Sequence, residues 1–286
     1  MGLVPVTMRK SEAMLRTLKE LHDYAIGAVD GVIGQVKDLY VDDEAWVVRY
    51  LVVGTGGWLM SRKVLISPMA IGEAHWATRQ LQVSSTMEQV RASPDFTSEE
   101  TVTRQHERDY ASYYGYPYYW GGIGYWGAGM YPSMMLSGYD TAAAQETMRQ
   151  EDRDDRTSAD DRRDGRADPH LRSCAAMTGY RIHASDGEIG HVSGMLIDDE
   201  TWAVRYLVVD TSNWWLGHQM LVAPPWIEGV SWSEHSVSVK LTRQTIKDAP
   251  AYDPHEGLTR ADEARLHDHY RRTGYWTIAD KNEAPQ

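Results

Sequence analysis

The sequence contains the same segment twice, 156 positions apart. DGVIGQVKDLYVDDEAWVVRYLVVGTGGW begins at Asp30, and DGEIGHVSGMLIDDETWAVRYLVVDTSNW begins at Asp186. With this single offset and no gap, 36 of the 106 residue pairs between 15–120 and 171–276 are identical. Average composition alone gives about 6 identities in 100 pairs. The chain is therefore a tandem duplication, and its fold must be built from two copies of one unit.

Each unit consists of a strand-rich segment followed by a helical extension. Residues 46–53 are almost all apolar, β-branched or aromatic, which predicts a strand buried on both faces. Asp30 and Gly31 form one turn signal, and the acidic run that starts at Asp42 forms another. Further strands are expected at 24–28, 33–41, 64–66 and 80–83, and helical segments at 86–90, at 242–246 and from Thr259 to near Gly274. Five or six short strands predict an all-β fold with short helices, in which each unit is a small closed antiparallel barrel.

Composition excludes several classes of protein. The chain has 29 Lys and Arg against 41 Asp and Glu, a formal charge of −12, which disfavours binding to nucleic acid by phosphate neutralisation. Cys174 is the single cysteine, so an intramolecular disulfide and a multi-cysteine zinc site are excluded. The start of the sequence does not have the pattern of a signal peptide, and no run of 18 apolar residues is present. A cytoplasmic protein is the expectation.

The repeated motif resembles the PRC-barrel family. The resemblance rests on DG-x-IG-x-V, the acidic turn, W-x-V-RYLVV and a later proline, at about 18–94 and again at 174–250. This family includes the cytoplasmic domain of the photosynthetic reaction centre H subunit and the C-terminal domain of a ribosome maturation factor. The extension T-R-x-x-E…Y…YW resembles the tail of soluble bacterial members, which are often linked to stress responses. The resemblance implies a small barrel used for docking, without a known active site.

The repeat and the resemblance together define an expected domain organisation. Each barrel is followed by its own helical extension, and a flexible linker, first rich in Gly, Tyr and Trp and then charged, joins the two units. Because single barrels of this type can pair, the two copies are expected to form an intramolecular pseudo-dimer. The boundaries are barrel 1 at 15–96, extension 1 at 97–120, linker at 121–170, barrel 2 at 171–252, extension 2 at 253–276 and tail at 277–286.

Candidate residues fall into two groups. The expected structural core consists of Trp46, Tyr50, Val52, Trp202, Tyr206 and Val208. The candidate interaction residues are the aromatic side chains Tyr118, Tyr119, Trp120, Tyr275 and Trp276. Arg49 and Arg205 occupy equivalent places in apolar strands, and each is expected to pair with an acidic residue of its own barrel.

The aromatic tract at 113–131 is open to several interpretations. A flexible linker is favoured over aromatic self-association or docking of a partner. Insertion at a lipid headgroup region is a further alternative, because Tyr and Trp favour such regions, although the tract has no Lys or Arg to bind anionic lipid. Stacking on single-stranded nucleic acid needs cations among the aromatic residues and is disfavoured.

No catalytic, cofactor-binding or metal-binding constellation is found. His267 and His269 are two residues apart on a helix, so they face different directions and are interpreted as solvated. The acidic run at Asp42 and its copy at Asp198 are interpreted as hairpin turns, because a calcium loop spaces its ligands alternately. Cys174 is expected to be a buried small apolar side chain.

These observations favour a non-enzymatic tandem PRC-barrel scaffold without cofactor, associated with stress responses, that docks a protein partner through barrel surfaces. The alternative is an accessory of electron transfer similar to the reaction centre H subunit and peripherally associated with a membrane. Association with RNA or the ribosome is disfavoured by the negative charge.

Overall fold

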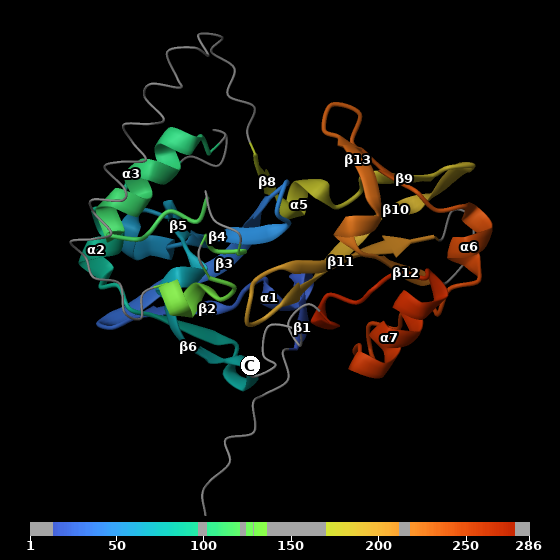
Figure 1. The fold of residues 1–286 in the computed structure, drawn as a ribbon. Helices are drawn as coiled ribbons and strands as arrows, with labels where there is room; N and C mark the ends of the chain where they lie inside the picture. Colours follow the sequence, from blue (N-terminus) through green and yellow to red (C-terminus); the bar gives the residue numbers. More distant parts are fainter. Residues whose placement is uncertain are drawn as a thin grey trace, which may run out of the picture.

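A computed structural model describes residues 14–96, 102–120, 124–127, 129–135, 170–211 and 218–277. The described chain forms two sheet-rich halves that lie side by side, with the first half in blue to green and the second in yellow to red (Figure 1). Each half contains a sheet of seven strands. The helices in this part of the chain are too short or too polar to cross a lipid bilayer.

The first sheet has the strand order β5-β4-β3-β2-β7-β6, and β8 adds to β3 outside this path. Its long central strand carries a bulge between Val36 and Asp38, so Val36 pairs with Val53 and Asp38 with Val52. The strands are β2 (Ala25–Ala28), β3 (Gly31–Asp42), β4 (Val47–Gly54), β5 (Lys63–Ile66), β6 (Ile71–His75), β7 (Gln80–Val83) and β8 (Leu171–Ser173).

The second sheet repeats this plan with the order β12-β11-β10-β9-β14-β13, and β1 adds to β10. A bulge between Val192 and Gly194 stands at the position equivalent to the bulge in β3. The strands are β9 (Arg181–Ala184), β10 (Gly187–Asp198), β11 (Val204–Asp210), β12 (Gln219–Val222), β13 (Ile227–Ser231), β14 (Ser236–Val239) and β1 (Leu15–Thr17).

The expectation of a purely antiparallel sheet is wrong at one pair in each half. β2 and β7 run parallel, and so do β9 and β14. Parallel neighbours need a long crossover, which here consists of all the chain between β2 and β7. The hydrogen-bonded path is open between its end strands β5 and β6, which η2 (Pro68–Ala70) joins directly. Closure of each sheet into a barrel stays a prediction.

The two halves exchange short strands. β1 belongs to the first repeat but pairs with β10 of the second sheet, where Arg16 lies opposite Ile197. β8 belongs to the second repeat but pairs with β3, where Arg172 lies opposite Val41. The two registers are the same under the offset of 156, so the halves are related by an approximate twofold axis. The sequence pattern did not reveal these three-residue strands.

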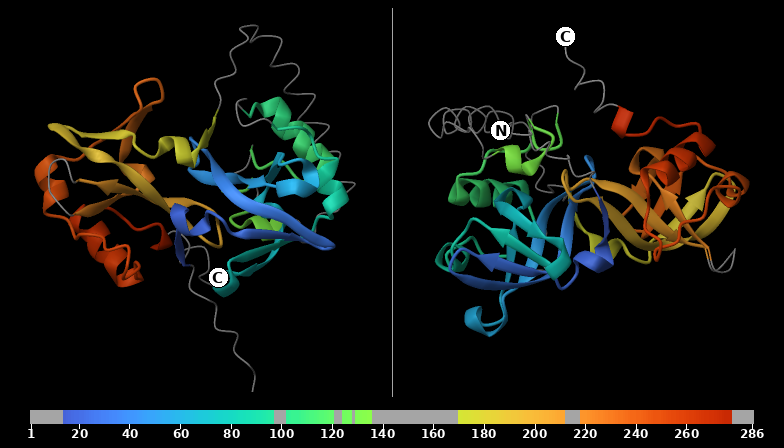
Figure 2. Two further views of the ribbon diagram at one scale, coloured as in Figure 1. Left: turned by 180° about the vertical axis from the view of Figure 1, so that it is seen from behind. Right: turned by 90° about the horizontal axis from the view of Figure 1, so that it is seen from below.

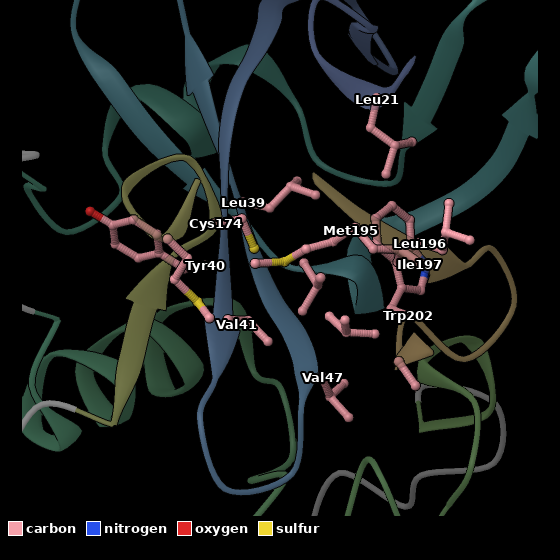
Figure 3. Packing of buried hydrophobic residues seen from close by; sticks show 14 of the residues in the cluster. Leu21, Leu39, Tyr40, Val41, Val47, Cys174, Met195, Leu196, Ile197 and Trp202 are labelled. Atoms are coloured by element: carbon pink, nitrogen blue, oxygen red, sulfur yellow. The ribbon is translucent and has the colours of Figure 1, made fainter. Parts of the chain in front are cut away.

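The tips of two hairpins also join the halves. Val47 forms a bridge with Ala203, while the Val48 N–H donates to the Trp202 carbonyl at 2.9 Å and the Val204 N–H donates to the Trp46 carbonyl at 2.7 Å. Apolar side chains pack beneath this backbone contact. Figure 3 shows buried residues of both repeats gathered there, with Leu39, Val41 and Val47 from the first and Cys174, Met195, Ile197 and Trp202 from the second.

Short helices cover the ends of the sheets. Helices α1 and α5 lie at the junction of the halves, whereas α3 and α7 lie on the outer sides, far from each other in every view (Figure 2). Thr86 and Thr259 cap their helices with complete capping boxes, and the helix start predicted at Thr259 is confirmed. The helices are α1 (Leu18–Leu21), α2 (Met87–Arg91), α3 (Arg104–Tyr114), α5 (Cys174–Met177), α6 (Arg243–Lys247) and α7 (Arg260–His269), with short 3-10 turns η1 (Gly56–Leu59), η3 (Trp76–Thr78), η4 (Pro132–Met135) and η5 (Pro224–Trp226).

Two local expectations need correction. Helix α7 ends at His269, five residues before Gly274, because Tyr270 already leaves helical geometry and Arg271 has a φ of +52°. Trp46 is only partly buried, and it lies in the turn before β4 with a φ of +55° and not in the strand. The other expected core residues Tyr50, Val52, Trp202, Tyr206 and Val208 are all buried.

The equivalent tryptophans provide a matched stability test. Trp202 is 4% exposed, so Trp202→Ala leaves a cavity between the halves and should lower the free energy of unfolding by about 3–5 kcal/mol. Trp46→Ala removes a partly exposed ring at the same backbone conformation and should cost clearly less. Urea unfolding followed by far-UV circular dichroism measures both. Equal losses in the two variants would contradict the packing described above.

Candidate functional site

A buried ion pair stands at the base of each hairpin tip. In the first half, Arg49 on β4 donates from Nε and Nη2 to Asp42 Oδ2 at 3.2 and 3.0 Å. The other oxygen of Asp42 accepts the N–H groups of Glu44 and Ala45, both at 3.0 Å, and so fixes the acidic turn. Burial alone would raise the pKa of Asp42, but Arg49 and these amide donors together lower it below its ordinary value.

The second half repeats this pair. Arg205 donates from Nε and Nη2 to Asp198 Oδ2 at 3.0 and 2.7 Å, and Nη2 also donates to the Thr201 hydroxyl at 3.0 Å. The predicted pairing of Arg49 and Arg205 with an acid of the same half is thus confirmed. The acid in each case is the first residue of the DDE motif, which the sequence indicated only as a hairpin turn.

An aromatic ring covers each guanidinium group. The Cζ atom of Arg49 lies 3.7 Å from the ring centre of Tyr119, and that of Arg205 lies 3.9 Å from the ring centre of Tyr275. Such cation–π contacts contribute about 2 kcal/mol where water is excluded. Tyr119 and Tyr275, both candidate interaction residues, therefore serve contacts within the chain.

A buried glutamate receives each of these tyrosine hydroxyls. The hydroxyl of Tyr119 donates to Glu107, which also accepts from Arg104 at 2.9 Å. We call Asp42, Arg49, Arg104, Glu107 and Tyr119 the first arginine cluster. The equivalent residues Asp198, Arg205, Arg260, Glu263 and Tyr275 form the second arginine cluster.

The second cluster adds one more tyrosine. Glu263 accepts from the hydroxyls of Tyr275 and Tyr206 at 2.9 and 3.0 Å and from Arg260 at 2.6 Å. Burial raises the pKa of Glu263, although Arg260 and the two hydroxyl donors oppose this. Every oxygen of this carboxylate is thus engaged within the protein.

The remaining candidate interaction residues lie around the two clusters. Trp120 and Trp276 stand 4.3 and 4.8 Å from the guanidinium carbons of Arg104 and Arg260. Tyr118 stacks on Trp120 with ring centres 4.3 Å apart. All three rings are partly exposed. The structure therefore gathers all five candidate residues, three at one cluster and two at the other.

A short piece of the aromatic tract connects the two clusters. Arg49 Nη1 donates to the carbonyl of Tyr125, and Arg205 Nη1 donates to the hydroxyl of the same residue at 2.9 Å. Trp126 is fully buried, and its Nε1 donates to the Thr201 carbonyl at 2.9 Å. The expected flexible linker at 121–170 needs correction here, since 124–127 and 129–135 form defined contacts. Residues 136–169, which include most of the charged part of the linker, lie outside the described residues.

A histidine lies beside each cluster, and the two histidines come from different parts of the chain. His170, which precedes the exchanged strand β8, places Nε2 2.8 Å from Glu107 Oε2. In the second half His267 of α7 contacts the Tyr206 hydroxyl at 2.9 Å. His267 is 5% exposed, so its interpretation as a solvated residue is wrong, and burial lowers its pKa. The first cluster thus has a histidine from the other repeat beside it, and the second has one from its own helix.

The charged groups within each cluster neutralise one another. Their carboxylates accept from arginine or tyrosine, and their guanidinium groups face carboxylates and rings. Within the described ranges, no three His, Cys, Asp or Glu side chains gather as ligands for a metal ion. Cys174 is fully buried, as expected, and burial raises its pKa. Identities shared by both repeats at Arg104, Glu107 and Tyr119 were the sequence signal for this network.

Removal of one acid tests the buried pair. Asp42→Asn leaves the Arg49 guanidinium buried without its carboxylate and should lower the free energy of unfolding by about 3–5 kcal/mol. Asp95→Asn is the matched control, because the Asp95 side chain is 91% exposed although it also pairs with an arginine. It should change stability by about 0.5 kcal/mol or less. Chemical denaturation at neutral pH measures both variants, and equal effects would refute a buried role for Asp42.

The pKa of Asp42 also predicts a pH dependence. Its value in the folded protein is lowered, whereas the unfolded value is about 3.9. Its contribution is therefore fully present above the unfolded pKa and is lost as pH falls through the folded pKa. Between pH 5 and pH 3 the wild type should lose more stability than Asp42→Asn, measured by urea unfolding at each pH. Parallel losses would show that this carboxylate is not linked to folding.

The comparison with family models identifies a known domain in the first half of the chain. A search of curated proteins gave no match. A scan against family models matched residues 25–75 to the PRC-barrel domain, a stretch that begins at β2, ends at β6 and includes both Asp42 and Arg49. The matched stretch is less than a fifth of the chain. The first sheet is thus built around a segment that is similar to the PRC-barrel domain.

Proposed function

We propose that the chain is a non-enzymatic tandem PRC-barrel protein, in which the two halves form an intramolecular pseudo-dimer that docks a protein partner. The second half lies outside the family match, but it repeats the motif of the first at 36 of 106 positions and has the same strand order. The single observation that carries the proposal is the reciprocal exchange of β1 and β8, because it makes each sheet depend on the other repeat.

A non-enzymatic role fits the arginine clusters. Their carboxylates and tyrosine hydroxyls bond to groups within the clusters. The clusters therefore hold the helical extensions against the sheets. An association with stress responses and a bacterial, cytoplasmic setting belong to this proposal through the family resemblance. Binding to nucleic acid does not, given the charge of −12.

One exposed apolar feature distinguishes the halves and indicates where a partner docks. Val29 and Val32 flank the turn between β2 and β3 and are 63% and 61% exposed. The equivalent residues of the second half are Ser185 and Glu188, both exposed and polar. Exposed apolar side chains on one copy alone are not required by the shared fold, and we infer that these two valines mark the docking surface.

A matched pair of double variants tests this surface. The full chain is used to capture and identify a partner from its host cells, and the purified partner is then titrated against each variant by calorimetry. Val29→Lys with Val32→Lys should weaken binding about tenfold or more, which corresponds to about 1.4 kcal/mol. Ser185→Lys with Glu188→Lys adds charge at the equivalent place and should leave affinity within about twofold.

Other outcomes of the same experiment would overturn the proposal. Equal affinity of both variants for the partner would show that the first-half turn is not the docking surface. Recovery of the chain with sedimented membranes or pigment complexes, without a protein that rebinds in purified form, would instead favour the accessory role similar to the reaction centre H subunit.

A further inference from the structure

Each half contains a tyrosine and a tryptophan that are neighbours in the sequence and whose rings are in contact. The ring centres of Tyr119 and Trp120 lie 5.0 Å apart, with an angle of 84° between the ring planes. Those of Tyr275 and Trp276 lie 5.1 Å apart, with an angle of 79°. The two pairs occupy equivalent positions of the repeat. Phenol and indole are the most easily oxidised aromatic side chains, so the same contact between two oxidisable rings is present twice.

The tryptophan of each pair is partly open to solvent. Trp120 and Trp276 are half-buried, so dissolved molecules can reach part of each ring. Tyr118, which is also half-buried, stacks on Trp120 and extends the accessible aromatic surface. Tyr119 is 7% exposed. A reactive molecule in solution therefore meets the Trp120 indole before it meets the Tyr119 phenol.

The hydroxyl group of each tyrosine already has a base as its partner. Tyr119 donates to Glu107, whose side chain is fully buried. Tyr275 donates to Glu263 at 2.9 Å, and burial raises the pKa of that carboxyl, which favours its uptake of a proton. Direct hydrogen-bond contact is the geometry from which a carboxylate accepts a proton. Because a phenol that loses an electron becomes a strong acid, its proton has an acceptor in place at both pairs.

The arginines require that electron and proton leave the tyrosine together. The Cζ atom of Arg49 lies 3.7 Å from the centre of the Tyr119 ring, and that of Arg205 lies 3.9 Å from the Tyr275 ring. A positive charge on either ring would be repelled by the guanidinium group beside it. Loss of the hydroxyl proton at the same time leaves a neutral phenoxyl radical, which adds no charge to the ring.

Another contact between tyrosine and tryptophan in the second half lacks these features. The ring centres of Tyr270 and Trp226 are closer, at 4.7 Å. Trp226 is 4% exposed, and the buried Tyr270 hydroxyl has no hydrogen-bond partner among the described residues. An electron that left Tyr270 would leave a proton without an acceptor there. Tyr270 is therefore an internal comparison for the other two tyrosines.

We propose that each Tyr–Trp pair intercepts one-electron oxidants, with the tryptophan as the point of entry and the tyrosine as the residue that holds the radical. A dissolved oxidising radical takes one electron from Trp120 and becomes an anion, and Trp120 becomes a radical cation. Tyr119 then gives one electron to Trp120 and its hydroxyl proton to Glu107. Trp120 is thereby restored, Tyr119 is a neutral phenoxyl radical and Glu107 is a carboxylic acid.

A reductant of the ascorbate class completes the cycle. It supplies one electron to Tyr119, and Glu107 returns the proton to the tyrosine oxygen. The equivalent residues of the second arginine cluster carry out the same steps. The inference does not depend on the docking role proposed above.

Pulse radiolysis of the full chain with azidyl radicals, which oxidise indole, tests this sequence of steps. The indolyl radical should convert to a phenoxyl radical at a rate that is independent of protein concentration. The conversion should be slower in heavy water than in ordinary water, because a proton moves with the electron. Added ascorbate should then remove the phenoxyl radical. Absence of the conversion, or equal rates in the two solvents, would overturn the proposal without any variant.

Tyrosine variants identify the residues that hold the radical. Tyr119→Phe combined with Tyr275→Phe should slow the conversion at least about tenfold, which corresponds to about 1.4 kcal/mol of activation free energy. Tyr270→Phe is the matched control, and its conversion rate should stay within about twofold of wild type. Equal rates in the double variant and the control would refute the assignment to Tyr119 and Tyr275.

Glutamate variants separate ring contact from proton transfer. Glu107→Gln combined with Glu263→Gln keeps all four rings but removes both bases, so the conversion should slow as much as in the double tyrosine variant. Melting followed by far-UV circular dichroism verifies that the variants are folded at the temperature of the measurement. Wild-type conversion in the folded glutamate variant would refute the role of the carboxylates. If that variant does not fold, the heavy-water comparison in the wild type decides the question.

Discussion

The unpaired edge of a long strand is the constraint on which this structure depends. The far ends of β3 and β10 extend toward the neighbouring half, and backbone N–H and C=O groups there need partners once water is excluded. Each repeat supplies those partners to the other, through β1 and β8. Because the donated strand belongs to one repeat and the edge to the other, neither sheet has its seven strands alone. The two halves are consequently one structural body, although the sequence reads as two units.

Charge placement reinforces this arrangement. Arg16 and Arg172, carried on the exchanged strands, pair with Asp199 and Asp43 of the opposite half at 3.1 and 2.8 Å. The neighbouring acids Asp42 and Asp198 are used inwardly, for Arg49 and Arg205. In each acidic turn, the first aspartate thus pairs with an arginine of its own half, and the second aspartate pairs with an arginine of the exchanged strand. This division explains why an acidic doublet, and not a single acid, stands at both turns.

The sequence predicted the elements well and their assembly less well. The strands at 33–41, 46–53 and 80–83 were visible because β-branched and aromatic residues run between clear turn signals, and Thr259 was visible as the start of a helix. The exchanged strands are three residues long and carry no periodicity that could be read. Parallel pairing of β2 with β7 depends on the path of some fifty intervening residues, which local pattern does not encode.

The candidate residues show the same limit. The pairing of Arg49 and Arg205 followed from charge in an apolar strand, but the part played by Glu107 and Glu263 depends on helices that return to the sheet. His267 looked solvated on its helix because only tertiary contact with Tyr206 buries it. Tyr125 and Trp126 were assigned to a linker since their composition is that of a loop, and no signal in the repeat marks them, as they have no counterpart in the second unit.

The contact of Tyr125 with both guanidinium groups has a consequence for stoichiometry. A segment that lies across an approximate twofold axis meets the two sides with different atoms, here a carbonyl on one side and a phenol on the other. Only one such segment fits, so two identical single-unit chains would each bring a copy and compete for the same place. Joining the units in one polypeptide lets one such segment serve both guanidinium groups.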